Sequence, residues 1–190
     1  MDEQVLKAMA RWPNVPAVHG WLRLDRRGGW HLIDRGQEGF DEARDGRGSP
    51  ITSPPIVEFI HRNYAHDALG RWYWQNGPQR VYVDLDAAPL VFRVFGEGRD
   101  ARLVAHSGEP VSRVDAGWIG PEGEILLATD LGPGVVHDLD LGALAIEERG
   151  DAMVLDLGGR EIALAGTADP AGTLGYVRRP RPSYGRNRQA

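Results

Sequence analysis

Residues 71–85 have the sequence Arg-Trp-Tyr-Trp-Gln-Asn-Gly-Pro-Gln-Arg-Val-Tyr-Val-Asp-Leu, which is the strongest local structural signal in the chain. An Asn-Gly pair between aromatic and β-branched runs is the preferred two-residue turn of a β-hairpin. We therefore expect two antiparallel strands joined at Asn76-Gly77, with Trp72 and Trp74 on one face and Tyr73 on the other. Gly158-Gly159 stands between two further apolar runs and predicts a second hairpin of the same kind.

The landmarks around these two hairpins recur in the same order, which indicates an internal repeat. Gly20-Trp21-Leu22 opens the first copy and Gly117-Trp118-Ile119 opens the second. Each opening precedes an apolar run (29–33; 123–127), a helical pattern (56–64; 135–144), a strand-turn-strand (70–85; 150–164) and a proline-led strand (88–92; 169–177). Because short turns join antiparallel strands, the sequence predicts an α+β fold of two tandem β-β-α-β-β-β repeats with mostly antiparallel sheets.

The rest of the chain divides around these repeats. Apolar residues at helical spacing over 3–11 predict a short N-terminal helix. We expect an N-terminal helix and linker at 1–19, a first repeat at 20–94, a connecting hairpin at 95–116, a second repeat at 117–178 and a disordered basic tail at 179–190. A polar, glycine-rich insertion at 34–49 predicts a mobile loop in the first repeat. We expect these parts to pack as one compact body.

The composition excludes several classes of site. The chain has 190 residues and no cysteine, so it forms no disulfide, thiolate zinc site or cysteine nucleophile. Its net charge of -5 does not favour binding to nucleic acid. The acidic start and the lack of a long apolar run lead us to expect no secretory signal, no membrane span and a cytoplasmic location.

Several segments of the first half resemble a bacterial family known only as a domain of unknown function. They are residues 50–60, 70–81 and 86–89, and residues 12–16 and 20–22 are similar to the start of that family. The order of the segments is also distantly similar to a second uncharacterised bacterial family, built from repeated α+β motifs, for which a role in signalling has been suggested. The resemblance covers residues 12–145. It implies an architecture and brings no catalytic residue with it.

Clusters of polar residues give no recognisable catalytic pattern. His61 and His66 are five residues apart, so on a helix they would point about 140° away from each other, which does not suit a shared metal ion. His106, Ser107 and Asp115 have no spacing typical of a nucleophile arrangement, although such a set is defined in space and stays open. We therefore assign no catalytic residue, no metal site and no cofactor.

Aromatic residues are concentrated in the first half, whereas the matching positions of the second half are mostly aliphatic or small. This asymmetry predicts a ligand-binding surface beside the 34–49 loop, formed by Trp30, Trp72, Trp74, Asn76, Gln79 and Arg80. The other interpretation is a tryptophan-rich core, because aromatic side chains dominate core burial.

The leading hypothesis is therefore a non-enzymatic binding or regulatory module that recognises a protein partner or a small ligand. A hydrolase or transferase with an unrecognised active site is the first alternative. The second is a structural or oligomerisation module that pairs through an exposed strand edge. The sequence leaves the oligomeric state open.

Overall fold

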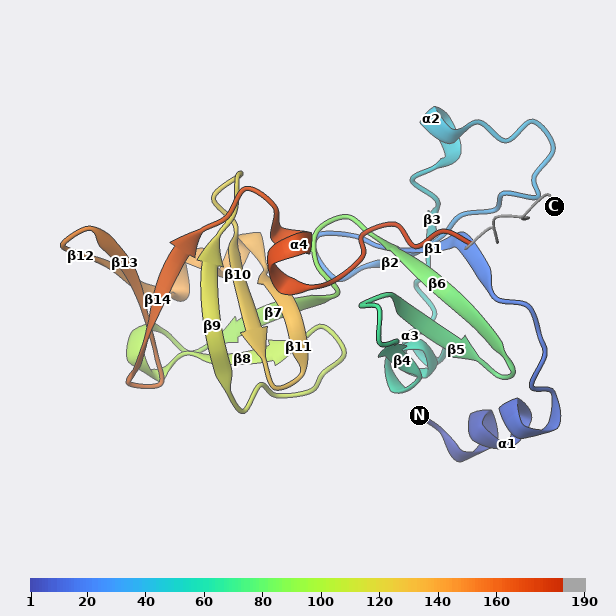
Figure 1. Ribbon diagram of the computed structural model, residues 1–190, viewed down its shortest axis with the longest axis horizontal. Helices are drawn as coiled ribbons and strands as arrows, with labels where there is room; N and C mark the ends of the chain where they lie inside the picture. Colours follow the sequence, from blue (N-terminus) through green and yellow to red (C-terminus); the bar gives the residue numbers. More distant parts are fainter. Residues whose placement is uncertain (183–190) are drawn as a thin grey trace, which may run out of the picture.

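The computed structural model describes residues 1–182 and contains two mixed β-sheets placed end to end (Figure 1). We call residues 1–86 the first lobe and residues 87–176 the second lobe. The α+β class and the short N-terminal helix α1 (Glu3–Arg11) are confirmed. No helix in the described range is long and apolar enough to cross a membrane.

The first lobe is built on a six-stranded sheet of order β3-β2-β1-β6-β5-β4. The central strands β1 and β6 run parallel, and the other neighbours are antiparallel. Two helices accompany the sheet, α2 (Glu42–Asp45) within the 34–49 segment and α3 (Pro54–Arg62). The strands are β1 (Val18–Leu24), β2 (Trp30–Leu32), β3 (Ser49–Pro50), β4 (Tyr64–His66), β5 (Trp72–Asn76) and β6 (Gln79–Leu85).

The second lobe is an eight-stranded sheet of order β12-β13-β14-β9-β10-β11-β7-β8. β14 pairs with β9, and β11 with β7, in parallel. The remaining elements are two 3₁₀ turns, η1 (Gly98–Asp100) and η2 (Asp138–Ala143), and the helix α4 (Pro170–Leu174). The strands are β7 (Leu90–Phe95), β8 (Arg102–Ala105), β9 (Val114–Ile119), β10 (Ile125–Thr129), β11 (Gly132–Val136), β12 (Ala145–Arg149), β13 (Ala152–Leu157) and β14 (Arg160–Gly166).

The strands from β9 to β14 follow the same spatial order as those from β1 to β6. The first sheet has the order 3-2-1-6-5-4, and the corresponding part of the second has the order 11-10-9-14-13-12. In both, the first strand lies parallel to the sixth. Each group contains six strands where the sequence predicts five. Two strands are additional (β3 and β4 in the first group, β11 and β12 in the second), and the predicted proline-led strand is not part of either group.

Both proline-led strands are placed differently from the prediction. Residues 90–95 form β7, which joins the second sheet rather than closing the first repeat. Asp169-Pro170 begins helix α4, because the Asp169 carboxylate accepts a hydrogen bond from the Gly172 N–H and proline suits the first helical turn. The apolar spacing over 135–144 belongs to the end of β11 and the 3₁₀ turn η2, not to an α-helix.

Two turns also differ from the prediction in detail. The loop between β5 and β6 is Gly77-Pro78, one residue later than expected, and Gly77 supplies the positive φ of +56° at its first position. In the connecting segment the chain turns back on β8, with an isolated antiparallel bridge between Val104 and Pro110, but residues 110–114 do not form a full second strand there. The main pairing of β8 is with β7.

A single cluster of buried apolar side chains runs through both lobes. It extends from Leu22 and Trp72 in the first lobe to Leu155 in the second. Close approach of the strands depends on Gly134 in β11, where a Cβ atom would lie 2.4 Å from the Phe92 ring of β7. The two sheets therefore share one hydrophobic core, which fixes the relation between the faces described below.

Candidate functional site

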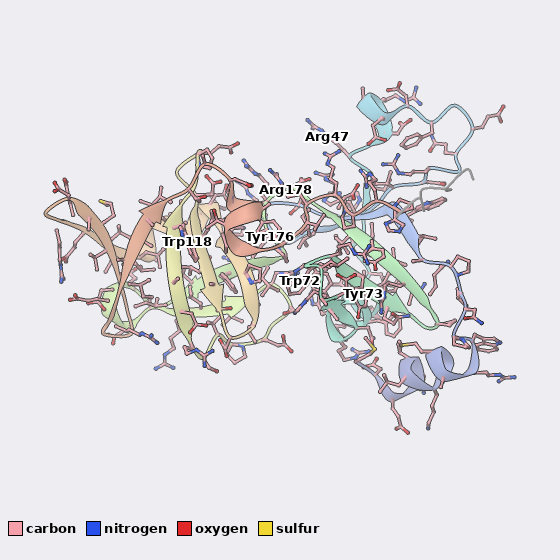
Figure 2. All side chains as sticks on the ribbon, in the orientation of Figure 1. Arg47, Trp72, Tyr73, Trp118, Tyr176 and Arg178 are labelled. Carbon is pink, nitrogen blue, oxygen red and sulfur yellow. The ribbon has the colours of Figure 1, made fainter. Side chains whose placement is uncertain are left out.

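The face of the first sheet opposite the core carries a strip of aromatic and charged side chains. Side chains alternate along β5 and β6, so Tyr73 lies opposite Trp72 and Trp74, and Arg80 and Tyr82 share its face. Figure 2 labels Trp72 and Tyr73 in this part of the first lobe. We define the outer strip as His19, Asp67, Arg71, Tyr73, Arg80 and Tyr82.

Ring stacking orders the centre of the outer strip. The Arg80 guanidinium lies 3.9 Å from the centroid of the Tyr73 ring, and that of Arg71 lies 4.8 Å from the Tyr82 ring. The two tyrosine rings meet edge to face at 5.9 Å, and His19 stacks on Tyr82 at 4.6 Å. Each guanidinium carbon thus lies over an aromatic ring within the distance of a cation–π contact.

The two arginines of the strip differ in their charge partners. Asp67 accepts hydrogen bonds from the Arg71 guanidinium at 2.8 Å and from the Tyr82 hydroxyl at 3.0 Å. Burial opposes its ionisation, but the hydrogen bonds from Arg71 and from neighbouring backbone N–H groups lower the pKa of Asp67 to about 2. Arg71 is therefore neutralised, whereas no carboxylate within residues 1–182 pairs with Arg80.

The chain returns to this face near its C-terminal end. The carbonyl oxygen of Arg178 accepts a hydrogen bond from the Leu85 N–H, and Arg181 donates to the Asp84 carboxylate at 3.0 Å. Within the segment predicted as a disordered tail, residues 179–182 are thus partly bound to the first sheet. The remainder of that segment, 183–190, lies outside the described residues.

The residues predicted for the binding surface fall into two groups. Trp30 and Trp72 are only 2% and 4% exposed and contribute to the shared core. Trp74 is half-buried on the same face, where its ring packs edge-on against Phe59. Asn76 and Gln79 flank the tight turn, close in sequence to Arg80 on the outer strip. The structure thus brings Asn76, Gln79 and Arg80 to one hairpin. By strand alternation, however, Asn76 and Gln79 share the face of the tryptophans, and Arg80 lies on the other face.

Sequence reasoning missed most of the outer strip. The alternation of β5 and β6 would have assigned Tyr73, Arg80 and Tyr82 to one face, because residues two apart in a strand share a side. No local signal brings Asp67 or His19 to them, since those contacts depend on the pairing of β1 with β6 and on the turn before β5.

A second polar cluster lies buried where the lobes meet. The rings of Trp30, His61, Tyr64 and His106 contact one another, with centroids between 5.1 and 6.2 Å apart. His106 accepts a hydrogen bond from the Val91 N–H at 3.3 Å, and its Nε2 atom has no hydrogen-bond partner. Burial, followed by the nearby His61, lowers the pKa of His106 to about 3. We call these four residues the junction cluster.

The junction cluster is surrounded by packed side chains. Ser107 follows His106 in sequence, and its hydroxyl is buried without a hydrogen bond. The five cavities described for residues 1–182 are not lined by His106 or Ser107. In residues 1–182 no group of three or more histidines and carboxylates could hold a metal ion.

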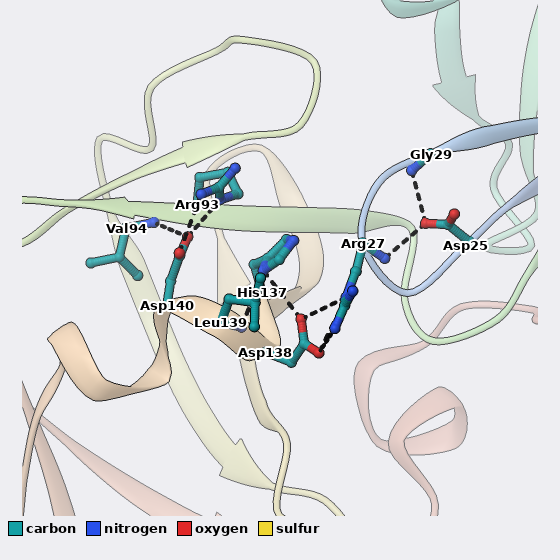
Figure 3. A network of polar contacts seen from close by, with 9 residues as sticks. All are labelled: Asp25, Arg27, Gly29, Arg93, Val94, His137, Asp138, Leu139 and Asp140. Carbon is teal, nitrogen blue, oxygen red and sulfur yellow. Dashed lines mark hydrogen bonds and ion pairs between the residues drawn. The ribbon is translucent and has the colours of Figure 1, made fainter. Parts of the chain in front are cut away.

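Ion pairs at the surface also cross the junction (Figure 3). Arg27, in the turn between β1 and β2, donates to the Asp138 carboxylate of η2 at 2.7 Å. On the second lobe Arg93 binds Asp140 at 2.6 Å, and hydrogen bonding from Arg93 lowers the pKa of that carboxyl group. The Arg27 pair is more than half exposed, so it aligns the lobes more than it stabilises them.

Comparison with known proteins places the chain among uncharacterised relatives. A crystal structure of a DUF1285 family protein from Silicibacter pomeroyi DSS-3 matches with a TM-score of 0.54 and 18% identity, over 86% of this chain and 95% of that one. A second, from Shewanella baltica OS155, matches with a TM-score of 0.43 and 11% identity, over 63% of this chain and 85% of that one. No curated protein matches the chain.

The likeness to the Silicibacter protein shows a shared fold and nothing further about activity. A family model described as "Protein of unknown function (DUF2946)" matches residues 1–181. The resemblance to uncharacterised families predicted from the sequence is thereby confirmed and extends beyond residues 12–145. Because the model matches nearly the whole chain, the protein belongs to the family described as "Protein of unknown function (DUF2946)".

Proposed function

We propose that the protein is a non-enzymatic, cytoplasmic binding or regulatory module that recognises an anionic group of a protein or a small ligand at the Arg80 end of the outer strip. The observation that carries this proposal is the Arg80 guanidinium, stacked at 3.9 Å on Tyr73 and without a carboxylate partner in residues 1–182. A guanidinium presents a planar fork of donors that matches a carboxylate or a phosphate.

The residues around Arg80 favour the binding of an anionic group by its guanidinium. Stacking on Tyr73 fixes the orientation of the guanidinium before a ligand arrives, which reduces the entropy lost on binding. By contrast, Arg71 is already paired with Asp67 and has less to offer to an anion.

We favour a binding role over hydrolysis or group transfer because of the position of His106 in the junction cluster. A catalytic histidine must reach its substrate, and His106 does not line any of the five cavities described above. Its low pKa follows from burial between the lobes, which is also the result expected of a packing residue.

We further propose that the two lobes derive from tandem copies of one unit, at 20–94 and 117–178. The support is the common strand order with a parallel first and sixth strand in each. On this view β7 and β8 are an addition between the copies. The first copy would then carry the recognition surface, and the second would have a different role.

The proposal is tested with the full chain and a panel of soluble mono- and dicarboxylates and phosphates, screened by thermal shift and followed by amide NMR. We expect binding to perturb residues around 73–82, Arg80→Gln to weaken it about tenfold, and Arg80→Lys to retain part of it. Arg11→Gln is the matched control, because Arg11 also stacks on an aromatic ring but stands at the end of α1. Equal weakening by Arg11→Gln, or an unchanged affinity in Arg80→Gln, would overturn the proposal.

A further inference from the structure

The second sheet contains a groove that no part of the proposed function uses. The sheet curls so that η1, which precedes the edge strand β8, lies against β13 near the opposite edge. Between these ends is a cavity of about 560 Å³, bordered by β8, by residues 110–114 and by the turn between β13 and β14. Its volume falls in the range of about 300–1,000 Å³ that is typical of small-molecule sites.

The floor of the groove is apolar and belongs to the core. Leu103 and Ile162 lie in it and are 2% and 7% exposed. Phe95 forms part of the wall and is 58% exposed, which is unusual for so large an apolar side chain. A ligand with an apolar body would therefore remove both its own surface and that of Phe95 from water.

The rim of the groove is basic in a chain whose net charge is negative. Arg102, Arg113 and Arg160 line it. Arg113 pairs with Asp115 at 2.6 Å, whereas Arg102 and Arg160 have no carboxylate partner within residues 1–182. Arg102 begins β8 and Arg160 begins β14, so the two arginines without a carboxylate partner belong to different strands that border the groove. This arrangement complements a single anionic group on an apolar ligand.

The edge of the sheet beside the groove does not favour a peptide as the occupant. A peptide would bind here by adding a strand to β8. That edge is already covered by the chain itself, because the Ala105 N–H donates to the Glu109 carbonyl at 2.8 Å and the Val111 N–H donates to the Leu103 carbonyl at 2.9 Å. With no free backbone row to extend, the groove suits a small molecule.

We propose that this groove binds a small amphipathic carboxylate, with its apolar body against Leu103, Phe95 and Ile162 and its carboxylate between Arg102 and Arg160. The site lies in the second lobe and does not depend on the Arg80 proposal. Its ligand must carry both parts, because the apolar floor alone would accept an alcohol and the two arginines alone would accept a simple anion.

The test compares decanoate, decan-1-ol and inorganic phosphate as probes of the full chain, by isothermal titration and amide NMR. Decanoate is expected to bind saturably and to shift residues 101–104, 110–114 and 157–162. Decan-1-ol and phosphate are each expected to bind at least about tenfold more weakly, because each lacks one part of the ligand. An affinity for decan-1-ol or phosphate equal to that for decanoate would overturn the proposal, as would shifts confined to other residues or a lack of saturable binding.

Variants test the rim and the mouth of the groove separately. Arg102→Gln and Arg160→Gln should each weaken decanoate binding about tenfold, while Arg44→Gln, which removes an exposed arginine of the first lobe, should not. Ser112→Trp adds bulk at the exposed mouth of the groove and should abolish binding with thermal unfolding unchanged. Retained binding in Ser112→Trp, or an equal loss in Arg44→Gln, would contradict the site. Arg80→Gln should leave decanoate binding intact, which keeps this test distinct from that of the outer strip.

Discussion

The two lobes have the same strand order over six strands, yet they present different surfaces at equivalent hairpins. In the first lobe the β5–β6 hairpin carries Tyr73 and Tyr82, and an arginine lies over each ring. In the second lobe the β13–β14 hairpin has no aromatic side chain, and the turn borders an open apolar groove. Strand order fixes where a hairpin lies, and the side chains decide whether its face is closed or open.

A shift of one residue separates the arginines of the two hairpins. Arg160 is the first residue after the Gly158-Gly159 loop and pairs with Leu157, as Gln79 pairs with Asn76 after the Gly77-Pro78 loop. Arg80 is the second residue after its loop, so its counterpart in the second hairpin is Glu161, not Arg160. Because neighbouring residues of a strand point to opposite faces, the two arginines serve opposite sides of their sheets.

The largest change in stability is expected from substitution of Trp72, whose side chain links the two lobes. Trp72→Ala removes a buried ring that packs beside Gly132 of the second lobe, so the free energy of unfolding should fall by about 3–5 kcal/mol. Urea unfolding followed by fluorescence and circular dichroism measures the loss. Both lobes of the wild type should unfold in one transition, because their core is continuous.

Trp21→Ala is the control within the same lobe, because Trp21 is 37% exposed and should cost far less stability. A wild type that unfolds in two separate transitions would contradict the shared core. So would a Trp72→Ala variant as stable as Trp21→Ala.

Local signals explain how much of this architecture could be predicted from the sequence. Helix α1 and the two tight hairpins follow from spacing and glycine positions within a few residues. The parallel pairing of β1 with β6 does not, since it joins residues about sixty positions apart. Residues 90–95 have a clear strand pattern, but nothing in that pattern says which sheet they enter. Asp169-Pro170 is a typical helix start, and it forms one here, although the repeat pattern predicts a strand at this position.

The same contrast between local signals and long-range pairing explains which residues of the sites could be predicted. Asn76, Gln79 and Arg80 belong to one hairpin and could be selected together from sequence. Trp30 and Trp72 are as aromatic as a binding surface requires, yet alternation places them on the core face. The groove depends on the curl of an eight-stranded sheet that brings η1, just before β8, against β13, and no short segment encodes that curvature.

A smaller change in the free energy of unfolding is expected when the pH is lowered, because His106 of the junction cluster titrates. His106 has a folded pKa of about 3 against an ordinary value of 6.5, so the unfolded chain binds the proton first as the pH falls below 6.5. Stability should therefore decrease on acidification, by up to about 1.4 kcal/mol per pH unit for this proton. His106→Asn retains a hydrogen-bond acceptor for the Val91 N–H and does not titrate, so its urea-derived stability should fall less steeply between about pH 6.5 and pH 5.

The slope, not the absolute stability, is the quantity to compare, because His106→Asn also changes packing. Ser107→Ala alters the same buried region without a titrating group and should keep the wild-type slope. Equal slopes in the wild type and His106→Asn would show that this histidine is not held neutral at the junction.

The smallest effect is expected from the ion pair between Arg27 and Asp138, although it is the polar contact that most visibly joins the lobes in Figure 3. Both side chains are more than half exposed, so water and salt screen their attraction. Arg27→Gln and Asp138→Asn should each leave the unfolding temperature nearly unchanged, and the difference from wild type should vanish in about 0.5 M NaCl. A single transition in both variants would place the coupling between the lobes in the buried contacts of Trp72. If Arg27→Gln instead split the transition in two, the charged surface would be what holds the lobes together.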